Sequence, residues 1–392
     1  MERRVVRGNQ RLKRIAAVVV AIGLAVALVL LARTGDEQGP AETVEPASSL
    51  VGRVLMIGFE GRDAGHRDVR RTLARLSRGE IAGVMFLRRN VGTGEEVRAL
   101  AARLHAAVPP AEAPPLVAVD QEGGRVARLG WRAGFPAVAA PRAVAERFTP
   151  EEAEAIYARM AGELRRLGFN VNFAPVVDVH HDANPIIGRL GRSFGQSPAV
   201  VTAYAGALVR AHRREGVLTA LKHFPGHGSS RADSHLGAVD VTDTWSPAEL
   251  EPFAALAGEA PMVMSAHTVN RNVGASGPAT LSRAALVGVL REQLGFAGVV
   301  VSDDLQMDAI ADLHGEERAA ELALRAGVDL LLFANDGRAD PTLVPRVTAH
   351  LERAARADAA FRQRLREAGD RVDRLRRLAT GGPSSRRDAT LR

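Results

Sequence analysis

Cysteine is absent from the 392-residue sequence, which excludes disulfide bonds and thiolate chemistry. Aromatic residues are scarce as well: they make up 4% of the chain, and only two of them are tryptophan. A long binding cleft lined with aromatic rings is therefore not expected. The remaining composition, with 46% hydrophobic and 25% charged residues, is typical of a folded globular protein.

Lysine is nearly missing, because 50 of the 52 basic residues are arginine. The two lysines are Lys13 and Lys222. Arginine carries a flat fork of donors, whereas lysine carries a compact charge. A single lysine in the body of such a chain therefore indicates a site that needs an ammonium group. Chance is the alternative explanation for the single lysine at position 222, which lies in the longest motif of the chain, residues 221–235.

The positive charge of the chain is confined to its ends. Of the formal net charge of +7, residues 1–14 contribute +5 and residues 383–392 contribute +2, which leaves zero for the residues between them. The body of the chain thus lacks the excess of basic residues that nucleic-acid binding requires. No nucleic-acid partner is expected.

The N-terminal sequence is typical of a membrane segment. Residues 1–14 are basic, and residues 15–32 contain no charge. Eighteen residues of helix would be about 27 Å long, close to the thickness of the hydrocarbon core. We therefore expect a basic cytoplasmic segment at 1–14, a transmembrane anchor or signal at 15–32 and a linker at 33–49. By the positive-inside rule the rest of the chain lies outside the cytoplasmic membrane, and it is secreted if the N-terminal segment is cleaved.

Short apolar runs alternate with longer amphipathic stretches after residue 49, which is the pattern of a parallel sheet. Eight strand–helix units of this kind close a (β/α)8 barrel of the TIM type, predicted over residues 50–345 and followed by a helix at 346–380 and a disordered tail at 381–392. A doubly wound open sheet is the alternative, but no GxGxxG motif follows the first strand. The α/β barrel is therefore favoured. The predicted strands are residues 54–59, 83–87, 116–120, 170–177, 218–223, 262–265, 299–302 and 329–333.

Polar side chains stand at the carboxyl end of nearly every predicted strand. The third strand runs directly into Asp120 and the seventh into Asp303 and Asp304. A charge that directly follows a buried strand is costly unless it has a function. The carboxyl ends of barrel strands carry the active site in enzymes of this fold, so these residues predict an enzyme. Because neighbouring strand residues face opposite ways, we expect only one of Asp303 and Asp304 to face the site.

The longest motif, residues 221–235, reads LKHFPGHGSSRADSH and opens from a strand end into a glycine-rich loop. Its histidines, His223, His227 and His235, are spaced by four and eight residues and resemble metal ligands only weakly, because glycine and proline make the segment a loop. The pair Asp233 and His235 allows a carboxylate to orient an imidazole for proton transfer. We therefore expect acid–base chemistry and no metal or cofactor.

Three motifs, KHFPGHG with DSH, DQEGGRV upstream and SDDLQM downstream, resemble glycoside hydrolase family 3, specifically its β-N-acetylglucosaminidases. The resemblance implies a retaining mechanism with Asp303 as the nucleophile and the pair Asp233–His235 as the acid/base. It also implies that a set of charged residues holds the non-reducing-end sugar: Asp120, Arg128, Arg192, Lys222 and His223. Only about 50 residues follow the barrel, too few for the second domain that other family members use.

The expected reaction is removal of terminal β-linked N-acetylglucosamine by an exo-acting, membrane-anchored enzyme. The expected substrates are peptidoglycan fragments, so the expected partners are a glycan or muropeptide and the cytoplasmic membrane. Two alternatives remain. A neutral imidazole does not repel an incoming anion, so phosphate in place of water would make the enzyme a phosphorylase. A catalytically silent glycan-binding module is the second alternative.

Overall fold

The computed structural model describes residues 47–232, 237, 239–336 and 340–379. Its main sheet has eight strands in the order β12-β9-β7-β6-β3-β2-β1-β13, and each neighbouring pair is parallel. A parallel bridge between Val301 and Leu330 joins the two ends of this order and closes the sheet on itself. The strands are β1 (Leu55–Gly58), β2 (Gly83–Phe86), β3 (Leu116–Val119), β6 (Val171–Asn172), β7 (Leu218–Phe224), β9 (Met262–Ser265), β12 (Val299–Ser302) and β13 (Leu331–Phe333).

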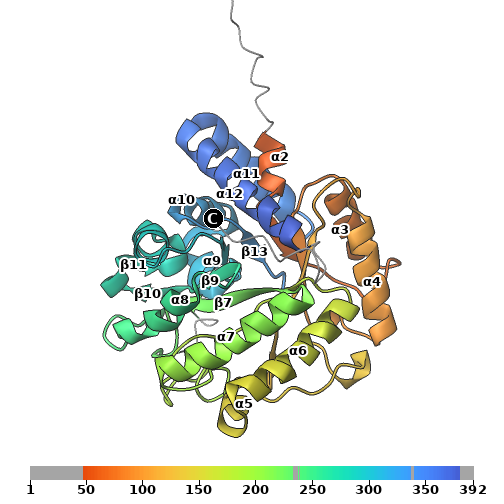
Figure 1. Cartoon of the computed structure of the whole chain (residues 1–392). Helices are drawn as coiled ribbons and strands as arrows, with labels where there is room; N and C mark the ends of the chain where they lie inside the picture. The colour runs from red at the N-terminus through yellow and green to blue at the C-terminus, as the bar shows by residue number, and fades with distance from the viewer. Residues whose placement is uncertain (1–46, 233–236, 238, 337–339, 380–392) are drawn as a thin grey trace, which may run out of the picture. The chain divides into compact units, whose positions relative to one another are not determined.

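Helices follow the strands in sequence and lie around the sheet (Figure 1). Several begin at a residue that caps them; Thr93 and Thr149, for example, each accept a hydrogen bond from the backbone N–H three residues later. The helices are α2 (Ala47–Gly52), α3 (Arg67–Ser77), α4 (Gly94–Ala106), α5 (Pro141–Arg147), α6 (Pro150–Arg166), α7 (Pro198–Glu215), α8 (Glu251–Leu256), the π-helix η7 (Ala284–Gln293), α9 (Asp308–His314), α10 (Glu316–Ala326), α11 (Leu343–Ala357) and α12 (Ala359–Leu378).

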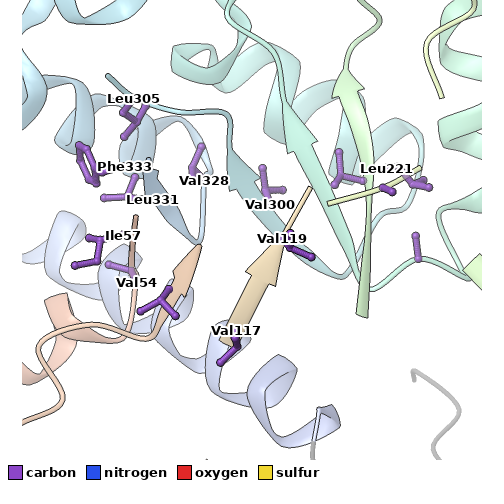
Figure 2. Close-up of a cluster of buried hydrophobic side chains, with 14 of the residues drawn as sticks. Val54, Ile57, Val117, Val119, Leu221, Val300, Leu305, Val328, Leu331 and Phe333 are labelled. Atoms are coloured by element: carbon purple, nitrogen blue, oxygen red, sulfur yellow. The ribbon is translucent and has the colours of Figure 1, made fainter. Parts of the chain in front are cut away.

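Alternation along each strand divides the core into two layers. Side chains such as Met56, Ala118 and Leu332 form one buried cluster to which all eight strands contribute, so they fill the inside of the barrel. Their immediate neighbours belong to a second cluster that packs between strands and helices. Figure 2 shows part of this outer layer, including Ile57 and Val117. The period of two therefore decides which side chains face the barrel axis.

Helix α12 packs against the barrel from the end opposite the polar strand ends. Its residues Val372 and Leu375 belong to the same buried cluster as the barrel interior. Arg376 donates to the backbone oxygens of Ala113 and Pro114, just before β3. Because β3 begins at Leu116, these contacts place α12 at the amino ends of the strands. The helix is therefore part of the barrel core.

The expected architecture, a barrel preceded by a transmembrane helix, needs correction. Within the described ranges, no helix combines the length and the apolar character needed to cross a membrane. Residues 15–32, on which that expectation rested, lie outside the described residues, as do residues 1–14 and 381–392. The fold that the structure supports is the barrel sheet with its helices.

Two elements differ from the sequence-based expectation. The predicted strand 170–177 is only Val171–Asn172, and a single bridge at Val176 continues it. Pro175 lies between them and has no N–H to donate to a ladder. The single helix expected at 346–380 is two helices, α11 and α12. The helix is interrupted at Asp358, whose backbone is extended. Its side chain caps α12 by accepting from the N–H groups of Ala360 and Phe361.

Candidate active site

A cavity of about 320 Å³ opens at the carboxyl ends of the strands. Its volume is at the lower end of the range for small-molecule sites, which suits a single sugar ring. Its apolar wall comes from the uppermost inward side chains of the barrel, such as Met85, Met264 and Leu332. Among its polar lining residues are Asp120, Glu122, Arg128, Arg192, Lys222, His223, His227, Asp303, Asp304 and Asp336.

Strand geometry explains why three of the predicted residues reach this cavity. Asp120 follows the inward residues Leu116 and Ala118, and Lys222 follows Leu218 and Ala220 at the same spacing of two. Asp303 extends the series Val299 and Val301 in the same way. Each polar side chain is therefore the next inward position of its strand, and the barrel brings them to one end.

A buried chain of ion pairs crosses the cavity floor. The Lys222 ammonium lies 2.9 Å from Asp120 and 2.7 Å from Glu122. Glu122 also accepts two hydrogen bonds from Arg192, at 2.9 and 2.8 Å. Arg128 lies 3.3 Å from the second oxygen of Asp120. The side chain of Glu122 is 1% exposed, so the two cations are its only compensation within the described structure.

The charges of this network determine its protonation. Burial alone would raise the pKa of Glu122, but Arg192 and Lys222 hold that pKa well below its usual range. Burial lowers the pKa of Lys222, and Asp120 and Glu122 more than offset this and raise it. Glu122 also raises the pKa of Arg192, so Glu122, Lys222 and Arg192 are all charged near neutral pH. Lys222 meets the expectation of a position that uses a compact cation, because its ammonium contacts two carboxylates at once.

Asp178 organises the histidines beside the network. Its Oδ2 lies 2.8 Å from His223 Nδ1, and its Oδ1 accepts from the backbone N–H groups of His223 and His227. Burial opposes ionisation of Asp178, but His223 keeps the pKa of this carboxyl below its usual value. Burial also lowers the pKa of His227 to about 4, so this imidazole is neutral at pH 7. Asp178 therefore fixes the orientation of His223 in the cavity wall.

Asp303 and Asp304 both line the cavity, so the expectation that only one of them faces it is wrong. Strand β12 ends at Ser302 and the chain bends there, so the alternation of the strand no longer applies. Asp304 Oδ1 accepts hydrogen bonds from the N–H groups of Gln306 and Ala334. Burial raises the pKa of Asp304 to about 6. The hydrogen bond from Ala334 connects the end of β12 to the end of β13, and one oxygen of Asp303 accepts from the N–H of Asp304.

The proposed acid/base pair, Asp233 and His235, lies outside the described residues. The part of the loop that precedes Asp233 is described, and Glu249 of η4 (Pro247–Leu250) hydrogen-bonds to it. Glu249 Oε2 accepts from the N–H of Gly228 at 2.9 Å. Gly226 adopts a φ of +120°, and a Cβ there would lie 2.6 Å from Glu249 Oε2. The glycine of the motif is therefore required by this close approach.

The structure thus brings together Asp303, Asp120, Arg128, Lys222 and His223, and it adds Arg192 through Glu122. Sequence reasoning did not select Glu122, Asp178, His227 or Asp304. Glu122 and His227 lie inside motifs that were recognised, and Asp178 follows a predicted strand, so these positions carried a signal. In the described part of the chain, no cluster of His, Asp and Glu has the arrangement of a metal site.

Comparison with known proteins identifies the family. The model of the glycosyl hydrolase family 3 N-terminal domain matches residues 50–375. A β-hexosaminidase of Alkalilimnicola ehrlichii is 38% identical over 307 residues, which cover 76% of this chain and 84% of that protein. The crystal structure of a β-N-acetylhexosaminidase from Beutenbergia cavernae has a TM-score of 0.75 and 31% identity, covering 84% of this chain and 98% of that one.

A structure of NagZ from Neisseria gonorrhoeae in complex with N-trifluoroacetyl-D-glucosamine has a TM-score of 0.64 and 28% identity, covering 82% of this chain and 98% of that one. These matches extend over the barrel and include the strand ends that line the cavity. The chain therefore belongs to glycosyl hydrolase family 3 and is a glycoside hydrolase.

Proposed function

We propose that this enzyme removes terminal β-linked N-acetylglucosamine from peptidoglycan fragments with retention of configuration. The observation that carries the proposal is the placement of Asp303 in a cavity for one sugar ring whose floor is the buried network of Asp120, Lys222, Glu122 and Arg192. A network of this kind orients hydroxyl groups, and a carboxylate beside it attacks the anomeric carbon. The similar proteins are named for the same class of activity.

In the first step, a carboxylate oxygen of Asp303 forms a bond to the anomeric carbon while the bond to the leaving oxygen breaks. His235, oriented by Asp233, gives its proton to that oxygen. In the second step, His235 takes a proton from water, the water oxygen bonds to the anomeric carbon, and Asp303 leaves as a carboxylate. Two displacements restore the original β configuration.

The charged groups of the floor bind the sugar. Asp120 accepts hydrogen bonds from sugar hydroxyls, and Lys222 and His223 donate to hydroxyl oxygens. Arg128 and Arg192 complete the set of fixed cations around the same ring. Because these groups are already paired with one another, they need little reorganisation when the sugar binds. The small cavity leaves room for one ring, which makes the enzyme exo-acting.

Location outside the cytoplasm forms part of the same proposal. It is supported only by the N-terminal sequence, in which a basic segment precedes eighteen uncharged residues. Peptidoglycan lies outside the cytoplasmic membrane and contains β-linked N-acetylglucosamine, so its fragments are the proposed natural substrates. Cell fractionation of the tagged full-length chain tests the location: recovery in the cytoplasmic fraction alone would contradict it.

The full-length protein should be incubated with 4-nitrophenyl N-acetyl-β-glucosaminide and with the matching β-glucoside, with and without phosphate. The expected result is release of free N-acetylglucosamine at a rate that phosphate does not change, with the β-anomer formed first when followed by NMR. A phosphate-dependent rate and a sugar 1-phosphate product would identify a phosphorylase instead. No release from either substrate would favour a glycan-binding module.

A variant of His235 tests its proposed role as the acid/base. Replacing His235 with alanine should reduce turnover of a natural disaccharide much more than turnover of the 4-nitrophenyl glycoside, because nitrophenolate leaves without a proton. Equal losses on the two substrates would remove His235 from this role.

A further inference from the structure

His267 is a buried residue to which the proposed mechanism gives no task. It lies two positions after β9, it is 1% exposed, and it is not among the described residues that line the cavity. Its Nε2 nevertheless lies 2.9 Å from the backbone oxygen of Asp304, the residue directly after the nucleophile Asp303. Because a buried imidazole loses its hydrogen bonds to water, its partners inside the protein indicate what it does.

The hydrogen-bond partners of His267 fix the orientation of its ring. A carbonyl oxygen only accepts, so Nε2 carries a proton and donates to the oxygen of Asp304. Nδ1 lies 2.9 Å from Oγ1 of Thr280, which is itself 2.8 Å from Oγ of Ser265 and 2.9 Å from the backbone oxygen of Ala266. Both ring nitrogens are therefore bonded, and the ring is tied to the end of β9 through Thr280.

The segment that carries the nucleophile is held between two strands. In the closed sheet, β12 lies between β9 and β13. On the side of β13, the N–H of Leu305 donates to the oxygen of Leu332 at 3.0 Å. On the side of β9, the N–H of Asp303 donates to the oxygen of Ser265 at 3.2 Å, and the bond from His267 follows one residue later. His267 therefore continues the attachment to β9 beyond the end of β12.

A further hydrogen bond connects this attachment to the carboxylate of the nucleophile. The backbone N–H of Asp304 donates to Oδ1 of Asp303 at 2.9 Å, while the backbone oxygen of the same residue accepts from His267. The position of the Asp304 backbone consequently determines the direction of the Asp303 carboxylate. Attack on the anomeric carbon requires a short distance and correct alignment, and a displacement of about 1 Å is enough to slow a reaction about a hundredfold.

We infer that His267 is a positioning residue for the nucleophile and acts through the backbone of Asp304. This inference rests on the proposed role of Asp303. Loss of the bond from Nε2 should slow the step in which Asp303 bonds to the anomeric carbon. It should leave sugar binding unchanged, because the ion-pair network of the cavity floor does not include His267.

Two substitutions separate the two ring nitrogens. The side-chain amide of asparagine reaches about as far as Nδ1 of histidine, and that of glutamine reaches about as far as Nε2. His267→Asn should therefore lose the bond to Asp304 and lower kcat/KM on 4-nitrophenyl N-acetyl-β-glucosaminide about 50-fold. His267→Gln keeps a donor for the same oxygen and should stay within about fivefold of the wild type. The inhibition constant of N-acetylglucosamine, which binds without reacting, should change by less than about twofold in both variants.

A second readout isolates the nucleophile from the acid/base. The 5-fluoro derivative of N-acetylglucosaminyl fluoride reacts by formation of a bond from an Asp303 oxygen to the anomeric carbon, while the carbon–fluorine bond breaks and fluoride leaves with its electron pair. Fluoride leaves without a proton, so the rate does not depend on His235. Intact mass follows the labelling, and peptide mapping identifies Asp303. The labelling rate should fall about 50-fold in His267→Asn.

His105→Asn is the matched control. His105 of α4 also has its Nε2 at 2.9 Å from a backbone oxygen, that of Gly168, which precedes β6 at the amino ends of the strands. The control removes the same kind of hydrogen bond from the same kind of side chain. It should lower the melting temperature, as His267→Asn does, and leave both kcat/KM and the labelling rate within about twofold of the wild type.

Three outcomes would overturn the inference: a labelling rate in His267→Asn within about threefold of the wild type, equal losses in the asparagine and glutamine variants, or an equal loss in His105→Asn. If His267→Asn does not fold, Thr280→Val replaces it. This variant keeps the imidazole and removes the hydroxyl that holds Nδ1, so it should lower the labelling rate about tenfold. Absence of labelling at Asp303 in the wild type would instead overturn the proposed function, and the inference with it.

Discussion

Glu122 shows how much a single buried charge can control at the residue scale. It touches both Lys222 and Arg192, and its own exposure is negligible. Removing the Glu122 charge leaves Lys222 with Asp120 alone and leaves Arg192 without a carboxylate partner in the described structure, in a region of low dielectric. Glu122 contacts no atom of the proposed reaction, so we regard it as a positioning residue for the two cations that meet the sugar.

Replacing Glu122 with glutamine keeps its shape and removes its charge. The variant should lose about 3 kcal/mol of unfolding free energy, because it breaks a buried ion-pair network. Its KM should rise more than its kcat falls, since Lys222 and Arg192 lose the geometry that binds the sugar ring. Urea unfolding and steady-state kinetics measure the two effects. Glu292→Gln, at an exposed position, is the control, and an unchanged KM in Glu122→Gln would contradict the positioning role.

Asp303 is the residue on which the proposed chemistry depends. Changing it to asparagine removes the nucleophile and keeps the side-chain volume, so turnover of the 4-nitrophenyl glycoside should fall on the order of a thousandfold or more. The melting temperature should stay close to that of the wild type. Asp308→Asn, an exposed carboxylate five residues later, should remain active. Wild-type turnover in Asp303→Asn would mean that another carboxylate, with Asp304 the nearest, attacks the sugar.

A residue of the site could be predicted from the sequence where the alternation of its own strand decides the direction of its side chain. Asp120, Lys222 and Asp303 each continue an inward series of their own strand, and the period of two finds them. Glu122 owes its role to Arg192, seventy positions away, and no local pattern reports that contact. The period of two did not predict that Asp304 lines the cavity, because the alternation ends where strand β12 ends, at Ser302.

The loop that follows β7 shows the same limit at the scale of elements. Its glycines predicted a loop, but the reason for Gly226 is Glu249, which comes from the later turn η4. The sequence likewise predicted the strand that contains Lys222 but not the contact of Glu249 with the loop that follows it. A contact between segments that are distant in sequence depends on the packed structure, and composition does not encode it.

Glu249 makes the unfolding free energy of the protein depend on pH. Burial raises its pKa from 4.5 to about 8. In the unfolded chain the carboxyl loses its proton near pH 4.5, whereas the folded protein keeps it up to about pH 8. Between these values the folded state binds more protons, so stability falls as pH rises, by up to about 1.4 kcal/mol per pH unit, and levels off above pH 8.

Glu249→Gln should remove this contribution. The glutamine oxygen still accepts from the N–H of Gly228, and the side chain has no proton to lose. The variant should match the wild type near pH 4.5 and become increasingly more stable than it up to pH 8. Urea unfolding at pH 5, 7 and 9 measures the difference. The exposed Glu251→Gln should follow the wild type at each pH, and a constant difference for Glu249→Gln would show that Glu249 ionises normally.

At the scale of the whole barrel, the two ends of the strands have separate tasks. The carboxyl ends carry the cavity, and the amino ends carry the contacts with α12. A second buried cluster of charges stabilises the amino ends of the strands: Asp329 pairs with Arg291 and with Arg364 and Arg371 of α12. The repeating strand–helix pattern predicted the barrel sheet, whereas nothing in that pattern required a further helix beneath it.

This separation predicts that a substitution at the amino ends of the strands can reduce the stability of the protein without loss of catalysis. Leu375 of α12 is 3% exposed and packs into the same cluster as the barrel interior. Leu375→Ala should lower the unfolding free energy by about 3 kcal/mol, because it removes buried methyl groups and leaves a cavity. Its kcat and KM at 25 °C should stay within about twofold of the wild type, since the cavity wall at the opposite end is unchanged.

The neighbouring Arg374→Ala provides the matched control on the same helix. Arg374 is exposed, so its loss should change stability by no more than about 0.5 kcal/mol. Urea unfolding and kinetics on the 4-nitrophenyl glycoside are measured for both variants. If Leu375→Ala unfolds like the wild type, α12 is only attached to the barrel surface. If its kcat falls together with its stability, the amino and carboxyl ends of the strands are coupled. A cavity at the amino ends then changes the positions of Asp120, Lys222 and Asp303 at the carboxyl ends.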